Sequence, residues 1–175
     1  MTNAESCAHW YALHVRPNYE MAVASRLRGL GIEEYVPLRK TSAVSGRNKP
    51  SPRSPLFPGY VFSFMDLQLG PRLYKIPGVL RVLGSGGQPT PLENEEIAMV
   101  RSVANSSLPA EPVPYLQAGD KVRLSSGPLA GISGTFVRML DETRLVVSLP
   151  LLQRSLALTM PAEWVTADAA WALAG

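Results

Sequence analysis

Two segments in the first half of the chain stand out: Trp10 to Arg16 alternates cleanly, and Tyr60 to Met65 is an aromatic-rich apolar run. Alternation predicts β-strands, because successive side chains of a strand point to opposite faces of its sheet. The faces of the first segment are Tyr11, Leu13 and Val15 on one side and Trp10, Ala12, His14 and Arg16 on the other. Those of the second are Tyr60, Phe62 and Phe64, and Val61, Ser63 and Met65.

The second segment follows Leu56-Phe57-Pro58-Gly59. Pro58 fixes its own φ and Gly59 accepts almost any φ, so the pair predicts a turn that leads into the strand. A sheet that is buried on one side needs only one apolar face. The aromatic face of this strand therefore has two interpretations, an ordinary central strand packed on both sides or a docking surface for a partner. The segment by itself favours the central strand.

Helix and strand signals alternate through the rest of the first half. A helix is predicted from Asn18, as its N-cap, to about Gly29, with Val23, Leu27 and Leu30 on its apolar stripe. The other expected elements are strands at 34–39 and 79–83, a short helix at 68–75, and a last helix that starts with a capping box at Thr90, Pro91 and Glu93 and buries Ile97, Val100 and Ala104.

The pattern changes in the second half. Residues 106–117 carry three prolines and no periodicity, which predicts a linker, and residues 41–55 are polar and proline-rich, which predicts a loop. After the linker, only short strand signals remain, separated by tight turns. They fall at 121–125, 135–140, 144–149 and 154–160 and predict a small β-barrel.

Composition narrows the class of protein. The chain has 175 residues, of which 46% are hydrophobic, so it can hold one medium domain or two small ones. Cys7 is the single cysteine and cannot form an internal disulfide, so we expect a reducing compartment. The N-terminus carries Glu5 and no apolar run, which argues against a signal peptide, and no segment approaches membrane-spanning length.

Positive charge is concentrated in the first half. Residues 1–108 carry 12 Lys and Arg against 8 Asp and Glu, whereas residues 109–175 carry 5 against 6. A basic first half suits a polyanion such as a nucleic acid, although a moderately basic surface is also compatible with solubility alone.

The sequence shows no combination of residues with the spacing of a catalytic or metal-binding site. His9 and His14 are the only histidines, and the sequence has neither a Cys/His cluster with zinc spacing nor a nucleophile elbow. The loop Gly84-Ser85-Gly86-Gly87 lacks the Lys-Ser/Thr of a phosphate-binding loop and indicates a flexible turn. We therefore expect a binding protein with no cofactor and no metal, not an enzyme.

Taken together, several motifs resemble the NusG family of transcription elongation factors over residues 9–166. Trp10-Tyr11-Ala12-Leu13, Leu56-Phe57-Pro58-Gly59-Tyr60-Val61-Phe62 and Ile76-Pro77-Gly78-Val79 look like its N-terminal domain. Gly119-Asp120-Lys121-Val122-Arg123-Leu124, then Gly127-Pro128-Leu129-Ala130-Gly131 and Gly134, look like its KOW domain. The resemblance implies an α+β fold, with a four-stranded antiparallel sheet and flanking helices followed by a small five-stranded, SH3-like barrel. The implied bounds are 1–106 for the N-terminal domain, 107–117 for the linker and 118–168 for the KOW domain.

The resemblance also implies a function. Its members bind RNA polymerase in the cytoplasm and favour processive elongation, docking on the clamp helices of the β′ subunit and bridging toward the β subunit; a monomer is expected. The docking residues implied here are Ala12, His14, Phe57, Tyr60 and Phe62. The implied contacts to upstream or non-template DNA are Arg16, Asn18 and Tyr19, with Arg72 and Lys75 as additions. Basic side chains would hold phosphates, and Tyr19 could stack on a base.

One loop departs from the family pattern. Housekeeping members carry an Ile-Phe-Gly-Arg-like loop whose Phe engages a ribosomal protein or the Rho terminator, and this chain has Leu151-Leu152-Gln153-Arg154. Leu152, expected at an exposed tip, offers no ring. The change favours a specialised paralogue, similar to the RfaH and UpxY antiterminators, over a general factor that couples transcription to translation or termination. A ribosome-associated, RNA-binding KOW protein, which needs a basic barrel, and a small enzyme, which needs a catalytic set, are the remaining alternatives.

Overall fold

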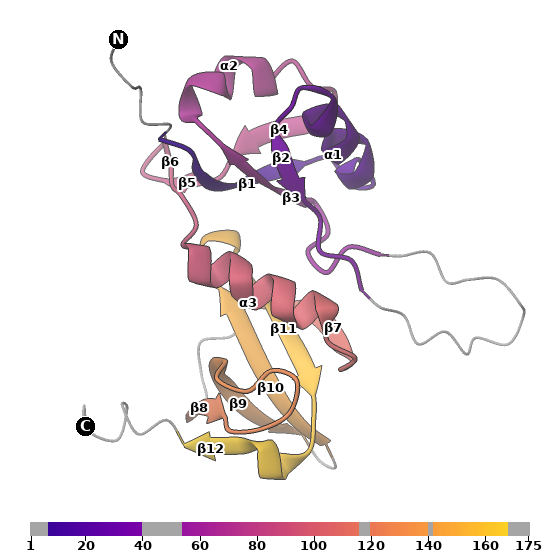
Figure 1. Cartoon of the computed structure of the whole chain (residues 1–175), viewed down its shortest axis with the longest axis vertical. Coiled ribbons are helices and arrows are strands. Elements are labelled where there is room, and N and C mark those ends of the chain that lie inside the picture. The colour runs from indigo at the N-terminus through magenta and orange to yellow at the C-terminus, as the bar shows by residue number, and fades with distance from the viewer. Residues whose placement is uncertain (1–6, 40–53, 116–119, 140–141, 168–175) are drawn as a thin grey trace, which may run out of the picture. The chain divides into compact units, whose positions relative to one another are not determined.

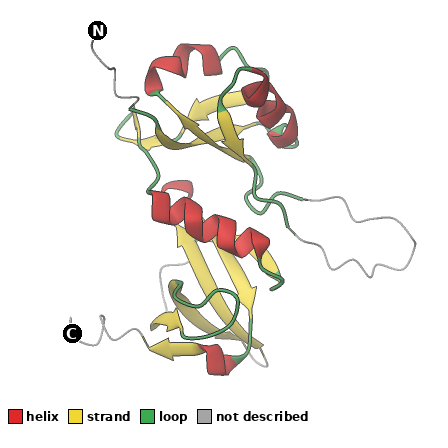
Figure 2. Ribbon diagram, viewed as in Figure 1, coloured by secondary structure: helices red, strands yellow, loops and turns green. Residues whose placement is uncertain are grey.

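The computed structural model describes residues 7–39, 54–115, 120–139 and 142–167. The chain divides into two compact units. Unit 1 comprises Met1–Pro37 and Phe57–Ile97, and unit 2 comprises Leu38–Leu56 and Ala98–Gly175. Each contains an antiparallel sheet (Figure 1, Figure 2). The predicted α+β class is confirmed.

Unit 1 is built on a four-stranded antiparallel sheet with the strand order β2-β3-β1-β4. The elements of this unit are β1 (His9–Val15), α1 (Glu20–Gly29), β2 (Glu33–Tyr35), β3 (Tyr60–Met65), the 3₁₀ helix η1 (Leu67–Leu69), α2 (Gly70–Leu73), β4 (Val79–Val82) and a hairpin of β5 (Gly84–Ser85) and β6 (Gln88–Pro89).

The pairing of β1 with β3 forms the centre of this sheet, with His9 opposite Met65 and His14 opposite Tyr60. The alternation predicted for both strands is confirmed, since one face of each strand packs into the core of unit 1. That core combines Tyr11, Leu13, Val15, Val61 and Met65 of the sheet with Val23, Ala24 and Leu27 of α1 and Leu73 of α2. Helices α1 and α2 therefore cover one face of the sheet.

Helix α1 starts at Glu20, and the predicted cap at Asn18 is wrong. Asn18 has a φ of 67°, and Tyr19, at the cap position, makes no side-chain cap hydrogen bond. The Tyr19 N–H donates to the carbonyl of Arg16 (3.0 Å), which closes a turn with Pro17 and Asn18 at its centre, and Asn tolerates the left-handed conformation that this turn needs. The buried stripe contains Ala24 instead of the expected Leu30, which is exposed.

Other elements of the first half form with shifted bounds. Strand β2 is shorter than predicted, and the helix expected at 68–75 is split into η1 and α2. Helix α3 (Asn94–Asn105) starts after the predicted capping box, because Leu92 first forms a bridge with Trp10. The cap forms three residues later instead, with the Glu93 N–H donating to the Glu96 carboxylate (2.9 Å). The predicted residues Ile97, Val100 and Ala104 are buried.

Unit 2 is a six-stranded antiparallel sheet with the strand order β12-β8-β9-β10-β11-β7. The predicted strands correspond to β8 to β11, and β12 adds the fifth strand expected for the barrel. Over the described residues β12 and β7 are the two edges of this sheet, which is not closed by a pairing between them. The elements are β7 (Ala110–Pro114), β8 (Asp120–Leu124), β9 (Ser133–Met139), β10 (Glu142–Leu149), η2 (Pro150–Leu152), β11 (Arg154–Thr159), η3 (Ala162–Trp164) and β12 (Val165–Ala167).

The sixth strand, β7, lies where the sequence predicts a linker. It pairs with β11, from Ala110 opposite Leu158 to Pro114 opposite Arg154. Prolines at 112 and 114 suggested an unpaired segment because proline cannot donate to a ladder. At a sheet edge only alternate N–H groups face the neighbouring strand, so two prolines of the same parity are tolerated. Of the loop predicted at 41–55, residues 41–53 lie outside the described residues.

Candidate functional site

The five residues expected to dock on a partner lie together on one face of the unit 1 sheet. In the β1–β3 register Ala12 is opposite Phe62 and His14 is opposite Tyr60. The rings of His14 and Tyr60 stack with their centroids 5.4 Å apart, and Phe57 meets Phe62 edge-on at 5.9 Å. We call these five residues the aromatic cluster. They lie on the face of the sheet opposite α1.

The exposure of the aromatic cluster differs from the expectation of an open apolar surface. Ala12 and Phe62 have no exposed area, Phe57 is 2% exposed and Tyr60 is 9% exposed, whereas His14 is half-buried. Apolar side chains gathered on one face are buried within the chain in preference to facing solvent. The accessible part of the cluster is therefore the edge at which His14 stacks on Tyr60.

The turn before β3 presents the cluster. The Tyr60 N–H donates to the carbonyl of Phe57 (3.2 Å), with Pro58 and Gly59 between them, and Gly59 has a φ of 84°. Proline followed by a residue of positive φ is the pattern of a type II turn, in which glycine is strongly preferred at the second central position. The turn confirms the Pro58-Gly59 prediction and places Phe57 and Tyr60 at its two ends.

Arg16, Asn18 and Tyr19 lie on the short loop between β1 and α1, and all three are exposed. The Tyr19 ring packs on Gly78, where a Cβ atom would come within 2.4 Å of Tyr19 Cδ1. Glycine at position 78 therefore allows the loop and the turn before β4 to approach each other. The arrangement leaves Tyr19 40% exposed, as a stacking role would require.

Arg72 and Lys75 line a groove in unit 1 with a volume of about 820 Å³. Arg26 of α1 joins them, although no sequence pattern pointed to it. Within the described part of the chain none of these three cations makes an ion pair. The groove is thus a basic site with an apolar floor, and its other lining residues are Ala22, Ser25, Gly29, Leu30, Ile76 and Pro77.

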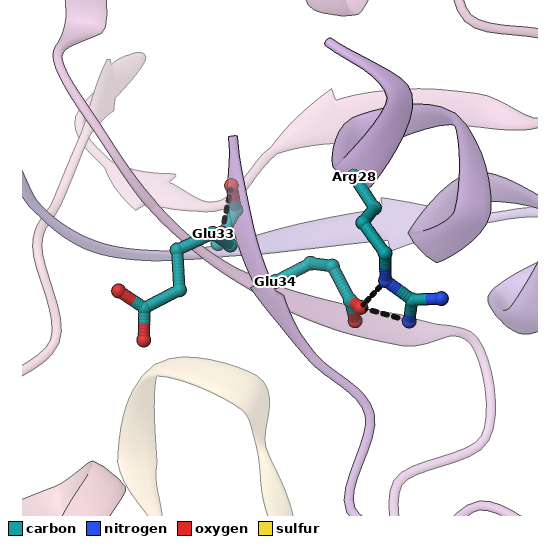
Figure 3. Close-up of polar contacts among 4 residues, drawn as sticks. Arg28, Glu33 and Glu34 are labelled. Carbon is teal, nitrogen blue, oxygen red and sulfur yellow. Dashed lines mark hydrogen bonds and ion pairs between the residues drawn. The ribbon is translucent and has the colours of Figure 1, made fainter. Parts of the chain in front are cut away.

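The other arginine near the end of α1 is engaged elsewhere. Figure 3 shows Arg28 reaching the carboxylate of Glu34 on β2, to which its Nε donates at 3.1 Å. The side chain of the neighbouring Glu33 extends away from this pair, while its backbone carbonyl accepts a hydrogen bond from the Ser63 hydroxyl (3.2 Å). Both arginines lie in the last turn of α1, but Arg26 lines the groove whereas Arg28 is paired with Glu34.

The loop Leu151-Leu152-Gln153-Arg154 of unit 2, which we call the partner loop, differs in two ways from the expected exposed tip. Leu152 is 3% exposed, so the expectation that it stands at an exposed tip is wrong. Gln153 adopts a left-handed conformation, with φ 51° and ψ 43°, a region in which glycine is preferred. Its N–H and its side-chain amide both donate to the carbonyl of Pro150, at 3.1 and 2.8 Å. Leu151 is half-buried, and the exposed Arg154 begins β11.

The described residues contain no group of three or more His, Cys, Asp and Glu side chains able to hold a metal ion. None of the described helices is long and apolar enough to cross a membrane. Burial, and secondarily the nearby Asp66, raise the pKa of Tyr11, which lies on the core face of β1 and not in the aromatic cluster.

Comparison with known families decides the relationship of the chain. The family model described as "Transcription termination factor nusG" matches residues 8–101, more than half of the chain and all of the elements that carry the aromatic cluster and the groove. The chain belongs to the NusG family. NusG factors act on transcription elongation and are not enzymes, so the expectation of a transcription factor is confirmed. Factors of this family bind RNA polymerase.

Individual NusG proteins resemble the chain over most of its length. The Campylobacter jejuni protein named transcription termination/antitermination protein NusG is 32% identical over 149 residues, which cover 78% of this chain and 81% of that protein. The Thermus thermophilus protein of the same name is 29% identical over 159 residues, covering 76% and 83%. A solved structure of Thermotoga maritima NusG has the same fold, with a TM-score of 0.58 at 23% identity, and covers 90% of this chain and 96% of that one.

The backbone of Gln153 provides a stability test in this NusG chain. An L-residue in the left-handed region costs roughly 1–2 kcal/mol, which glycine avoids. Gln153→Gly should therefore be more stable to chemical unfolding than Gln153→Ala by about 1 kcal/mol, since both variants lose the side-chain hydrogen bond to Pro150 and only alanine keeps the strained conformation. Equal midpoints for the two variants would show that position 153 is not held in the left-handed region.

Proposed function

We propose that this chain is an elongation and antitermination factor whose aromatic cluster docks on RNA polymerase, at the clamp helices of the β′ subunit, with the β subunit as a further contact. The observation that carries the proposal is the cluster itself. Two central strands and a type II turn bring two phenylalanines, a tyrosine and a histidine to one face of a sheet whose other face is filled by α1 and α2. The residues that carry most binding energy at protein interfaces are few and are enriched in Trp, Tyr and Arg, of which the cluster contributes Tyr60.

Docking requires that the buried members of the cluster become accessible to the partner. His14 and Tyr60 offer the first contact, because they are its more exposed members. Tyr60 also combines an apolar ring with a hydroxyl, which suits an interface that is partly wet. We therefore assign the initial contact to the His14–Tyr60 edge and the full interface to all five residues.

The proposal includes contact with upstream or non-template DNA through Arg16, Asn18, Tyr19, Arg72 and Lys75. Support comes from the exposure of all five residues and from the groove, where Arg72 and Lys75 meet Arg26 without a neutralising carboxylate among the described residues. Lys and Arg bind phosphates largely through charge, and Tyr19 can stack on a base. The groove lies on the helix-covered side of the unit 1 sheet, whereas the aromatic cluster lies on its other face. DNA and polymerase would therefore contact different sides of unit 1.

We further propose the role of a specialised antitermination paralogue, with a polymerase-binding domain within 1–106 and a KOW domain at 118–168, working as a monomer in the cytoplasm. Residues 107–117 connect the two and include strand β7 of the unit 2 sheet. The support is the partner loop, where a buried Leu152 offers no aromatic anchor. The second candidate is a general factor that couples transcription to translation or termination through a ribosomal protein or Rho. It is favoured by the relatives, which are named transcription termination/antitermination proteins in several bacteria.

The polymerase contact is tested most simply at Tyr60. Tyr60→Ala in the full chain should weaken binding to polymerase core by about 1–3 kcal/mol, because an aromatic anchor at an interface is lost. Tyr60→Phe keeps the ring and should bind nearly as well as the wild type. Binding can be measured by biolayer interferometry, with circular dichroism to verify the fold. Full affinity of a folded Tyr60→Ala variant contradicts the proposal.

The DNA contact is tested by removing single charges. In an elongation complex, Arg72→Gln and Lys75→Gln should each weaken crosslinking to the non-template strand, and each should reduce the slope of log affinity against log salt by about 0.7–0.9. Arg28→Gln is the matched control, because it removes the same charge from a residue that is held by Glu34. An Arg28→Gln effect as large as the other two would mean that only net charge matters.

The specialised role is tested at the partner loop. Titration calorimetry of the full chain with the small-subunit ribosomal protein and with Rho should show binding weaker than micromolar, because the loop presents no ring face. Leu152→Phe/Gln153→Gly, which restores the family pattern, should gain affinity for at least one of them. Micromolar or tighter binding by the wild type would assign the chain to the general factors.

A further inference from the structure

Glu20 is a charged side chain that is buried, with 5% of its surface exposed. It is the first residue of α1, where a carboxylate is favoured by the helix dipole. A buried charge requires hydrogen-bond partners to offset the loss of water. One partner is not in α1 at all: the Gly59 N–H donates to Glu20 Oε1 at 2.7 Å, across 39 positions of the sequence.

The geometry of the turn explains why Gly59 needs this acceptor. The turn's own hydrogen bond runs from the Tyr60 N–H to the Phe57 carbonyl, and it leaves the Gly59 N–H unused. The Gly59 carbonyl accepts from the Val15 N–H at 2.8 Å, at the end of β1. Gly59 is therefore held from both sides, by β1 through its carbonyl and by α1 through its amide. Glu20 is the side chain that completes this attachment.

The two surfaces of the proposed function meet at this point. Residues 57 and 60, at the ends of the turn, belong to the aromatic cluster, and Tyr60 stacks on His14. Directly before Glu20 runs the loop with Arg16, Asn18 and Tyr19, the proposed DNA contacts. The two hydrogen bonds of Gly59, to Val15 and to Glu20, thus join both ends of the DNA loop to the turn that presents Tyr60.

We propose that Glu20 is a positioning residue for polymerase docking: by binding the Gly59 amide it fixes the turn that presents Phe57 and Tyr60, without touching the polymerase itself. The inference rests on the proposed docking function of the aromatic cluster. Because the bond also anchors the start of α1, the position of Tyr60 and that of the DNA loop depend on the same carboxylate.

The test compares variants that differ in the acceptor. Glu20→Gln keeps an oxygen at the same distance from the backbone, whereas Glu20→Met keeps the length and apolar packing but has no hydrogen-bonding oxygen. In the full chain, Glu20→Met should bind polymerase core roughly 5- to 30-fold more weakly, as expected when a buried donor loses a charged partner. Glu20→Gln keeps an acceptor for the Gly59 N–H and should remain within about threefold of the wild type. A small loss is expected because a neutral acceptor forms a weaker hydrogen bond than a charged one.

An NMR measurement on the free protein reports the hydrogen bond directly. The Gly59 amide proton should lie downfield in the wild type and in Glu20→Gln, and should move upfield and exchange faster with solvent in Glu20→Met. Ser63→Ala is the matched control, because it removes another buried hydrogen bond of the same sheet, on the core face. It should lower stability without changing polymerase binding. If Glu20→Met does not fold, Glu20→Asp, whose carboxylate is withdrawn by one methylene, should show the same two changes.

The outcomes separate this inference from the docking proposal when Tyr60→Ala is measured in parallel. Weak binding by both Tyr60→Ala and Glu20→Met, with rescue by Glu20→Gln, supports both. Weak binding by Tyr60→Ala with wild-type binding by a Glu20→Met that has lost the Gly59 signature overturns the positioning role and leaves docking intact. Wild-type binding by Tyr60→Ala overturns both. An equal loss in Ser63→Ala would assign the effect to general destabilisation and overturn the positioning role.

Discussion

The antiparallel pairing of β1 with β3 is the constraint on which the rest of unit 1 depends. Its register places His14 opposite Tyr60 and so decides which side chains enter the core and which form the aromatic cluster. Because side chains of a strand alternate with a period of two, a slip of one residue would send the cluster into the core and the core residues to the other face. The filling of one face by Leu13, Val15 and Val61 against α1 excludes that slip.

Three turns meet at one end of this sheet and connect its two proposed functions. The loop after β1 bonds to Gly78 through Arg16, Tyr19 packs on the same glycine, and Glu20 holds Gly59. The aromatic cluster lies on one face of the sheet, and the basic groove is formed by α1 and the segment between α2 and β4 on the other side. Such an arrangement would let a NusG factor hold polymerase and DNA at the same time.

Much of the fold could be predicted, because strong alternation determined the faces of β1 and β3 and Pro58-Gly59 indicated its turn. The errors arose where tertiary contacts overrule local preference. Asn18 is a good N-cap in isolation, but the hydrogen bond from the Tyr19 N–H to the Arg16 carbonyl places it inside a turn. Pro112 and Pro114 favour a linker, but β7 is an edge strand and accommodates both prolines because they have the same parity. Glu20 and Arg26 gave no sequence signal, since their roles come from Gly59 and from Arg72 and Lys75, residues far away in the sequence.

The central claim is that polymerase contacts the aromatic cluster, and site-specific photocrosslinking tests it most directly. A photoreactive phenylalanine analogue would replace Tyr60 in the cluster, or Leu67 in η1, which is 38% exposed and lies outside both proposed surfaces. With polymerase core, the account predicts a crosslink to the β′ subunit from position 60 and none from position 67. Crosslinking from position 67 but not from position 60 would contradict it.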